Sequence, residues 1–463
     1  MKKSASNFAM LLVACGLAGL AAAQDLVPGD DALLQALEQF DRLEQARNNT
    51  DMQLAEPLLQ IASQYRARGR FADAHAALDR GMQIVRINNG LYSNQQLPFL
   101  EGKIENYADW GDWESARELL EHLMWLHRTK TRFIDQALLD DLMDVSRFHL
   151  RGISEDSLEF QSYHFRRALS ANWLAVGAAE RLWSATDRRL VPMLYGLIKQ
   201  YHLQTIAVNR GGRTGYELRQ IVPGTDWLRE RSEMRLYFYE TGQRIFNQLE
   251  EIYSAEGAVD AEAIAMIRLY RADWQLIHSR DEQALESYRQ AFDGLVAANV
   301  SAELVNQYLA TPAVLPVSDF YESLDNALIA RVEQPDLPDQ EGLELDDSAL
   351  YFAEWSNSFP YASSPLRDSG AGQLDSNFAL FSLNLSGPTE ISRWLSSRTI
   401  IEFGNLIDAT LLHSDQVSVE NRGELRQRLN WLQFRPRLVD GSPEQSSATL
   451  LYQQAPAPRV LDF

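Results

Sequence analysis

The chain has 463 residues, 45% of them hydrophobic and 10% aromatic, and a formal net charge of −21. This length and composition predict two to four folded units and exclude a chain that is largely disordered. The negative charge argues against nucleic acid or an anionic lipid surface as the main partner, and favours a basic partner or a cation.

The first 23 residues are expected to be a secretory signal peptide. Lys2 and Lys3 precede the apolar run FAMLLVACGLAGLAAA, and Ala21–Ala23 form an A-x-A cleavage site. This form of signal predicts export to a bacterial cell envelope, and specifically to the periplasm. No later stretch approaches 18 apolar residues, so no membrane span is expected in the mature chain.

Cys15, the only cysteine, leaves two alternatives to ordinary cleavage after Ala23. The phrase LVAC resembles a lipobox, in which Cys15 would become the lipidated first residue, and retention of the segment as an anchor is the third alternative. Ordinary cleavage would leave the mature protein without cysteine, and therefore without a disulfide, a thiolate metal site or a cysteine nucleophile.

Residues 24–330 carry copies of one helical pattern. The segment IASQYRARGRFADAHAALDRG (61–81) aligns with GKIENYADWGDWESARELLEHL (102–123), and AMIRLYRADWQLIHSRDEQALESYRQAFDGL (265–295) is a third copy. The pattern resembles the tetratricopeptide repeat (TPR), which implies antiparallel helix pairs that cross at small residues and reverse at a turn glycine. The implied repeat-packing residues are Tyr65, Gly69, Phe71, Ala74, Leu78, Tyr107, Gly111, Trp113, Ala116, Leu120, Ala272, Ala284, Tyr288 and Ala291.

The residues between the copies are expected to be degenerate helix pairs of the same α-solenoid. Apolar residues recur there at steps of three and four, for example in LLDDLMDVSRFHL and RLVPMLYGLIKQYHLQTIAV. The number of repeats between 131 and 260 stays open. The sequence predicts that residues 331–376 form a partly ordered acidic linker, because 333–347 is rich in acidic residues and proline and lacks Lys and Arg. Its apolar island, LYFAEWSNSFPYA, is expected to pack onto one of the flanking domains.

Residues 377–455 are expected to form a small α+β domain of the ββαββ type, followed by a tail at 456–463. FALFSLNLSGPTEISRW alternates as two strands about a turn, Leu425–Leu432 lies in an amphipathic helix, and Asp440-Gly441 joins two further strands. This order, with its Phe434-Arg435-Pro436 phrase, resembles the C-terminal domain of TonB-type proteins.

The TonB-type resemblance implies that a partner peptide adds to an exposed strand edge. The candidate edge is the closing strand, with residues Ala448, Thr449, Leu450, Leu451 and Tyr452.

No residue pattern predicts catalysis, a cofactor or a metal site. The eight histidines form no H-E-x-x-H motif and no other spacing that is typical of metal ligands. The segment NRGGRTG (209–215) lacks the Lys-Ser/Thr ending of a phosphate-binding loop. The sequence therefore predicts a non-enzymatic adaptor that binds protein or peptide partners in the cell envelope. The alternative is a TonB-like energy-transducer component that contacts an outer-membrane receptor. The sequence makes no prediction of the oligomeric state.

Overall fold

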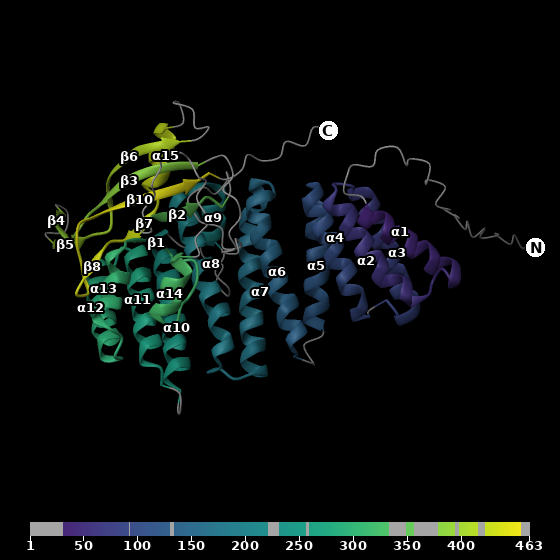
Figure 1. Ribbon diagram of the computed structural model, residues 1–463, viewed down its shortest axis with the longest axis horizontal. Helices are drawn as coiled ribbons and strands as arrows, with labels where there is room; N and C mark the ends of the chain where they lie inside the picture. Colours follow the sequence, from purple (N-terminus) through teal and green to yellow (C-terminus); the bar gives the residue numbers. More distant parts are fainter. Residues whose placement is uncertain are drawn as a thin grey trace, which may run out of the picture. The chain divides into compact units, whose positions relative to one another are not determined.

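The computed structural model describes residues 31–91, 93–129, 134–220, 231–255, 259–332, 349–355, 378–393, 398–414 and 422–454. The chain divides into two compact units between Leu123 and Met124 (Figure 1). The predicted signal peptide, the acidic segment 333–347 and the C-terminal tail lie outside the described residues.

The first unit is built from paired α-helices. Helix α2 packs against α3, and α3 packs against α4. The helices are α1 (Asp31–Ala46), α2 (Ala55–Ala67), α3 (Phe71–Asn89), α4 (Leu97–Trp110) and the first part of α5 (Trp113–Thr129).

Glycine makes the two reversals that the repeat pattern predicts in this unit. Gly69 follows α2 with φ +70°, and Gly111 follows α4 with φ +84°. Residues with a Cβ rarely adopt this left-handed conformation, so glycine lets one helix end and the next begin within a few residues. Ala74 and Ala116, the small residues of the pattern, are fully buried where the helices pack.

The second unit begins with a further series of helices. Successive long helices contact one another, from α6 with α7 to α11 with α12. Their bounds are α6 (Gln136–Glu155), α7 (Gln161–Leu182), α8 (Val191–Arg210), α9 (Gly212–Gln220), α10 (Arg231–Ser254), α11 (Ala261–Ile277), α12 (Asp281–Ala297), α13 (Ala302–Ala310) and α14 (Leu324–Val332).

The third copy of the repeat forms the pair α11 and α12, although Ser279 stands in place of the turn glycine. Ser279 itself adopts φ +56°, so the turn keeps its left-handed residue without glycine. Ala272, Ala284, Tyr288 and Ala291 are buried in this pair. The glycine-rich phrase at 209–215 is a short break between α8 and α9, with Gly211 and Gly212 both at positive φ.

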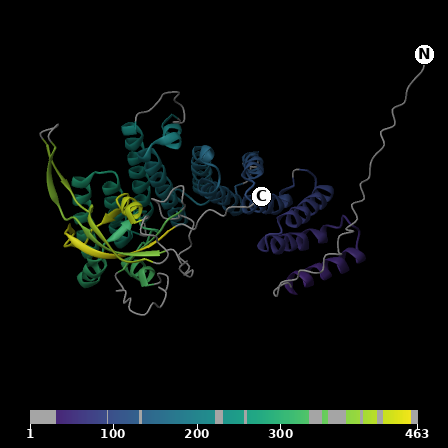
Figure 2. The same ribbon diagram turned by 90° about the horizontal axis from the view of Figure 1, so that it is seen from above.

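The strands of the second unit lie against the ends of its last helices (Figure 1, Figure 2). A four-stranded sheet has the order β2-β10-β3-β6, and short pairs form between β1 and β7, β4 and β5, and β8 and β9. The bounds are β1 (Ala313–Leu315), β2 (Leu350–Ala353), β3 (Phe378–Leu385), β4 (Thr389–Arg393), β5 (Arg398–Glu402), β6 (Leu406–Ser414), α15 (Arg422–Leu429), β7 (Gln433–Arg435), β8 (Leu438–Val439), β9 (Ser442–Pro443) and β10 (Ser446–Gln453).

One apolar core joins this sheet to α15. The inward face of β3 supplies Phe381, Leu383 and Leu385, and α15 supplies Leu425 and Leu429. The predicted helix, turn and closing strand are therefore present. The helix of the segment Arg422–Leu432 begins at Arg422 as expected and ends three residues earlier, at Leu429. Asp440 and Gly441 both have positive φ between β8 and β9, as a tight two-residue hairpin turn requires.

The predicted open edge is wrong for Leu450, Leu451 and Tyr452. These residues pair with β3 on one side and with β2, in parallel, on the other. The second partner is the start of the apolar island, which as predicted packs onto a neighbouring part of the protein. Ala448 and Thr449 pair with β3 in the described register, beyond the end of β2.

The predicted separation of the β region from the helices is also wrong. Residues 124–463 form one compact unit, so the helices from α6 onward and all the strands belong together. The physical link is β1, which follows α13 and pairs antiparallel with β7 from the C-terminal region. Among the described helices, none has the length and apolarity needed to cross a lipid bilayer.

Candidate functional site

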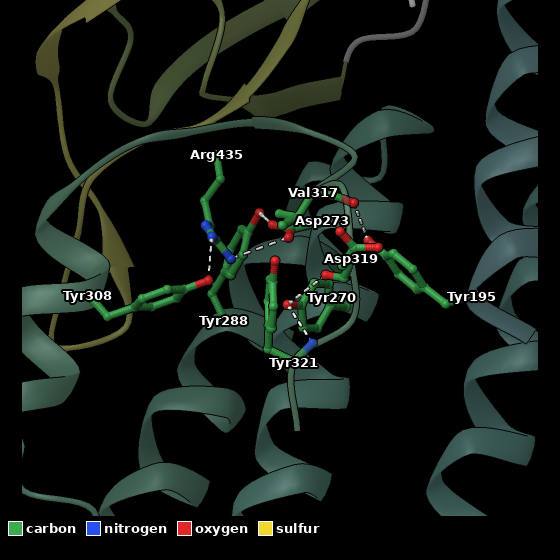
Figure 3. A network of polar contacts seen from close by, with 9 residues as sticks. All are labelled: Tyr195, Tyr270, Asp273, Tyr288, Tyr308, Val317, Asp319, Tyr321 and Arg435. Atoms are coloured by element: carbon green, nitrogen blue, oxygen red, sulfur yellow. Dashed lines mark hydrogen bonds and ion pairs between the residues drawn. The ribbon is translucent and has the colours of Figure 1, made fainter. Parts of the chain in front are cut away.

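A buried ion pair connects the helices of the second unit to the strands. Arg435 on β7 places its Nη1 atom 3.3 Å from Oδ2 of Asp273 on α11, and both side chains are at most 4% exposed (Figure 3). The hydroxyl of Tyr288 on α12 donates to the other carboxylate oxygen of Asp273 at 2.7 Å. The Nη2 atom of Arg435 donates to the hydroxyl of Tyr308 on α13 at 3.5 Å. Arg435 is thus bonded to α11 and α13, and α12 bonds to its carboxylate partner, Asp273.

The charges of this pair depend on each other. Burial raises the pKa of Asp273 to about 6, against the lowering effect of Arg435 and of the Tyr288 hydrogen bond. Burial acts to lower the pKa of Arg435, but Asp273 and the nearby tyrosines together raise it above its usual value. Both groups are therefore charged at neutral pH, and each keeps the other ionised in a site from which water is excluded.

Tyrosines fix the connection that leads from α13 toward α14. The hydroxyl of Tyr195 donates to the carbonyl of Val317 at 2.7 Å, and that of Tyr270 donates to the carbonyl of Asp319 at 3.2 Å (Figure 3). The ring of Phe320 lies between helices, 5.1 Å from the Tyr270 ring. This connection is bonded to α8 and α11, so it holds β1 in position for pairing with β7.

The Asp273–Arg435 cluster is structural in character. Both oxygens of Asp273 already accept hydrogen bonds, and its side chain is buried with those of Arg435 and Tyr288. A general base must come within hydrogen-bond reach of the proton that it removes, and the burial of this carboxylate keeps a substrate out of that reach. Across the described residues, no group of three His, Cys, Asp or Glu side chains is arranged to hold a metal ion.

The four-stranded sheet has two edge strands, β2 and β6. The residues of β2 are mostly buried, whereas β6 has the features of a protein-binding edge. β6 pairs with β3, and no other strand in the described part of the chain pairs with β6. Ile407 and Leu412 are 58% and 55% exposed, which places two large apolar side chains on this edge strand. An edge strand also presents backbone donors and acceptors that are free to pair with an added strand.

The backbone direction of β6 follows from a contact with α15. Arg426 donates from Nη2 to the carbonyl of Ala409 at 3.0 Å and to Oδ1 of Asp408 at 2.9 Å. We infer from this contact that the carbonyl of Ala409 points away from β3. Alternate residues of a strand point their backbone groups to opposite edges, so Thr410 points toward β3.

Two histidines and an aspartate form a buried chain of polar contacts between α6 and α7. His149 on α6 and His164 on α7 approach with their Nδ1 atoms 3.0 Å apart, and Nε2 of His164 lies 2.9 Å from Oδ2 of Asp156. Burial lowers the pKa of His149, and His164 and Arg167 lower it further. His149 is therefore neutral at neutral pH, where it links two helices.

The repeat-packing residues that the sequence singles out fall into two groups. Leu78, Trp113, Leu120 and the alanines are buried, whereas Tyr65, Phe71 and Tyr107 are half-buried at the margins of their helix pairs. Sequence reasoning assigned Tyr288 to packing alone and missed its bond to Asp273. It also missed Asp273 and Arg435. Asp273 lies between the core residues Ala272 and Trp274, and a charged residue at such a position indicates a buried residue of opposite charge.

Comparisons with known proteins add a distant likeness in the helices. No family model matches the chain, and no curated protein sequence matches it. A solved structure of nearly identical TPR-like repeats, from a Podosopora anserina protein described as a kinesin light chain, aligns with 54% of this chain and 99% of that one. Its sequence identity is 11% and its TM-score is 0.34. The helix pairs themselves show a mainly α fold in a TPR-like arrangement, followed by a strand-rich C-terminal region.

Proposed function

We propose that this protein is a non-enzymatic scaffold that binds protein partners, and that it captures an extended partner segment by strand addition at β6. The carrying observation is a nine-residue edge strand, Leu406–Ser414, that presents two exposed apolar side chains. Such an edge gains main-chain hydrogen bonds when another strand joins it, and side-chain pockets on the edge then set specificity. The formal charge of −21 favours a segment that carries basic residues.

The edge at β6 replaces the edge first expected at the closing strand. β10 is flanked by β2 and β3, so an incoming segment would have to displace β2 to reach Leu450–Tyr452. At β6, within the described residues, the contacts to displace are those of the Arg426 side chain with the Ala409 carbonyl and the Asp408 carboxylate. Strand addition at β6 therefore leaves the existing ladder intact.

A matched pair of substitutions at Ala409 tests strand addition. Ala409→Pro removes the outward N–H of an edge position, and Ala409→Val adds similar bulk while keeping that N–H. We expect the proline variant to lose capture of the partner from envelope extract, and the valine variant to retain it. Ala409 is buried in the core that the sheet shares with α15, so both variants should melt below the wild type. Capture is therefore compared at a temperature at which circular dichroism shows both variants to be folded.

Hydrogen exchange then identifies the mode of binding. In the captured complex, backbone amides of β6 should exchange more slowly than in the free protein. A folded Ala409→Pro variant that captures the same partner would refute the proposal, as would a complex in which the β6 amides stay unprotected. Thr410→Pro serves as the contrasting change, because it removes a donor that faces β3 and should destabilise the sheet itself.

We also propose that the protein is exported to the cell envelope. The support is the basic start, apolar run and Ala21–Ala23 cleavage site of the sequence. Sequencing the N-terminus of the mature protein should give Gln24 as the first residue. A lipid on Cys15 would instead mean a tethered scaffold, and an intact N-terminal segment would favour the TonB-like transducer over the scaffold.

A further inference from the structure

Three arginines lie near one another at the start of α10 and in the turn before α12, in the second unit. Arg235 precedes Tyr239 by one helical turn, so the two side chains share a face of α10. The guanidinium carbon of Arg280, in the turn before α12, lies 5.3 Å from the centre of the Tyr239 ring. Arg231 begins α10, one turn before Arg235. Positive charge thus accumulates locally in a chain whose formal charge is −21.

Arg235 has no carboxylate partner among the residues that the structure describes. Its side chain is half-buried, and its Nε atom is buried without a hydrogen-bond partner. Burial lowers the pKa of Arg235, and the like charges of Arg231 and Arg280 lower it further. A charge held in this way is unfavourable unless an anion compensates for it.

A buried imidazole faces the same place with an open nitrogen. His278 is 6% exposed, its ring lies 5.7 Å from that of Tyr239, and its Nε2 atom has no hydrogen-bond partner. Burial lowers the pKa of His278 to about 3, with His202, Arg235 and Arg280 contributing, so it is neutral at pH 7. A neutral imidazole adds a hydrogen-bonding atom beside the guanidinium groups without adding charge.

We propose that Arg235, Arg280 and His278 form a binding site for a doubly charged oxyanion of the phosphate class. Two guanidinium groups match the charge of a phosphate dianion, and their planar arrays of donors suit its oxygens. Arg280 is exposed, so the site opens to solvent on that side, and Arg231 adds positive charge near its entrance. The ligand would join α10 to the turn between α11 and α12 in the unit that carries the sheet.

Isothermal titration of the full protein with inorganic phosphate, at low ionic strength and pH 7.5, tests the site directly. We expect saturable binding that weakens at least tenfold in Arg235→Gln and in Arg280→Gln. Arg42→Gln is the matched control, because Arg42 is an exposed arginine of α1 paired only with Glu38. Acetate, which has one charge and two oxygens, should bind at least tenfold more weakly than phosphate.

Melting in phosphate-free buffer provides a second readout that does not depend on binding. Arg235→Gln relieves repulsion among like charges, so its melting temperature should equal or exceed that of the wild type. A lower melting temperature for Arg235→Gln would overturn the proposal, because it would show that a carboxylate of the chain itself holds this guanidinium. Absence of saturable phosphate binding, equal binding of acetate, or unchanged binding in Arg235→Gln would overturn it too.

Discussion

Replacing Arg435 by methionine should destabilise the second unit strongly. Methionine fills much of the same volume but removes the charge that faces Asp273 across 3.3 Å. Breaking a buried ion pair from one side leaves an uncompensated buried charge and costs about 3–5 kcal/mol. The hydrogen bond from Tyr288 to Asp273 remains in this variant, so the expected loss lies toward the lower end, about 3 kcal/mol.

The double variant Asp273→Leu, Arg435→Met separates the cost of an unpaired charge from the net contribution of the ion pair to the free energy of unfolding. Removing both charges removes the desolvation penalty together with the attraction, so the double variant should lie within about 2 kcal/mol of the wild type. Tyr288→Phe removes one hydrogen bond to a charged group and should cost about 1.5–3 kcal/mol. The coupling between Asp273 and Arg435 then follows from the double-mutant cycle.

Urea unfolding followed by circular dichroism and tryptophan fluorescence measures these free energies. The loss in Arg435→Met should be smaller at pH 5 than at pH 8. The reason is that Asp273, whose pKa of about 6 lies above its usual range and rises further without Arg435, becomes protonated and neutral as the pH falls. Arg42→Met, at an exposed pair, should change stability by no more than about 0.5 kcal/mol. A cost below about 1 kcal/mol for Arg435→Met, or a cost independent of pH, would refute this account of the ion pair between Asp273 and Arg435.

Four further substitutions test the helices. Gly111→Ala should cost about 1–2 kcal/mol because a side chain disfavours φ +84°, whereas Gly177→Ala, with open space around its Cβ inside α7, should raise the melting temperature. Gly242→Ala should cost about 1–3 kcal/mol in urea unfolding, since its Cβ would lie 2.3 Å from the Trp274 ring. The pKa of His202 is lowered to about 4 by burial, so the unfolded chain binds the extra proton first. Protonation of His202 should by itself remove about 3 kcal/mol of stability as the pH falls from 6.5 to 4, and His202→Phe should lose less than the wild type over this range by about that amount.

The local features of the fold could be predicted because they are encoded within a few residues. A glycine or alanine at a set place in the repeat determines a turn or a helix crossing, and Asp440-Gly441 defines its hairpin without any distant contact. The strand alternation at 378–385 is local in the same sense. Even Ser279, which departs from the repeat, adopts the conformation that the pattern requires.

The strand order could not be predicted, because it depends on pairings between distant residues. β2 and β10 are about a hundred residues apart, and an interior strand has the same alternation as an edge strand. The apolar composition of the segment LYFAEWSNSFPYA predicted that it is buried, but it did not predict that β2 pairs with β10. Asp273 and Arg435, 162 positions apart, show the same limit, since a charge at a core position implies a counter-charge without saying where it lies.

The contacts between residues 377–455 and the preceding chain also determine how far the β region can act as a domain of its own. A fragment of residues 377–455 lacks β2, so β10 would become an open edge at Leu450–Tyr452, where the intact chain is paired. The fragment also lacks Asp273, which leaves Arg435 on β7 without its counter-charge, and β1, which pairs with β7. In the intact protein β2, which precedes this fragment in the chain, therefore covers the β10 edge of the sheet, and its own residues are mostly buried. β6 is left as the place where another chain can join, and partner capture should be measured on the whole protein rather than on this fragment.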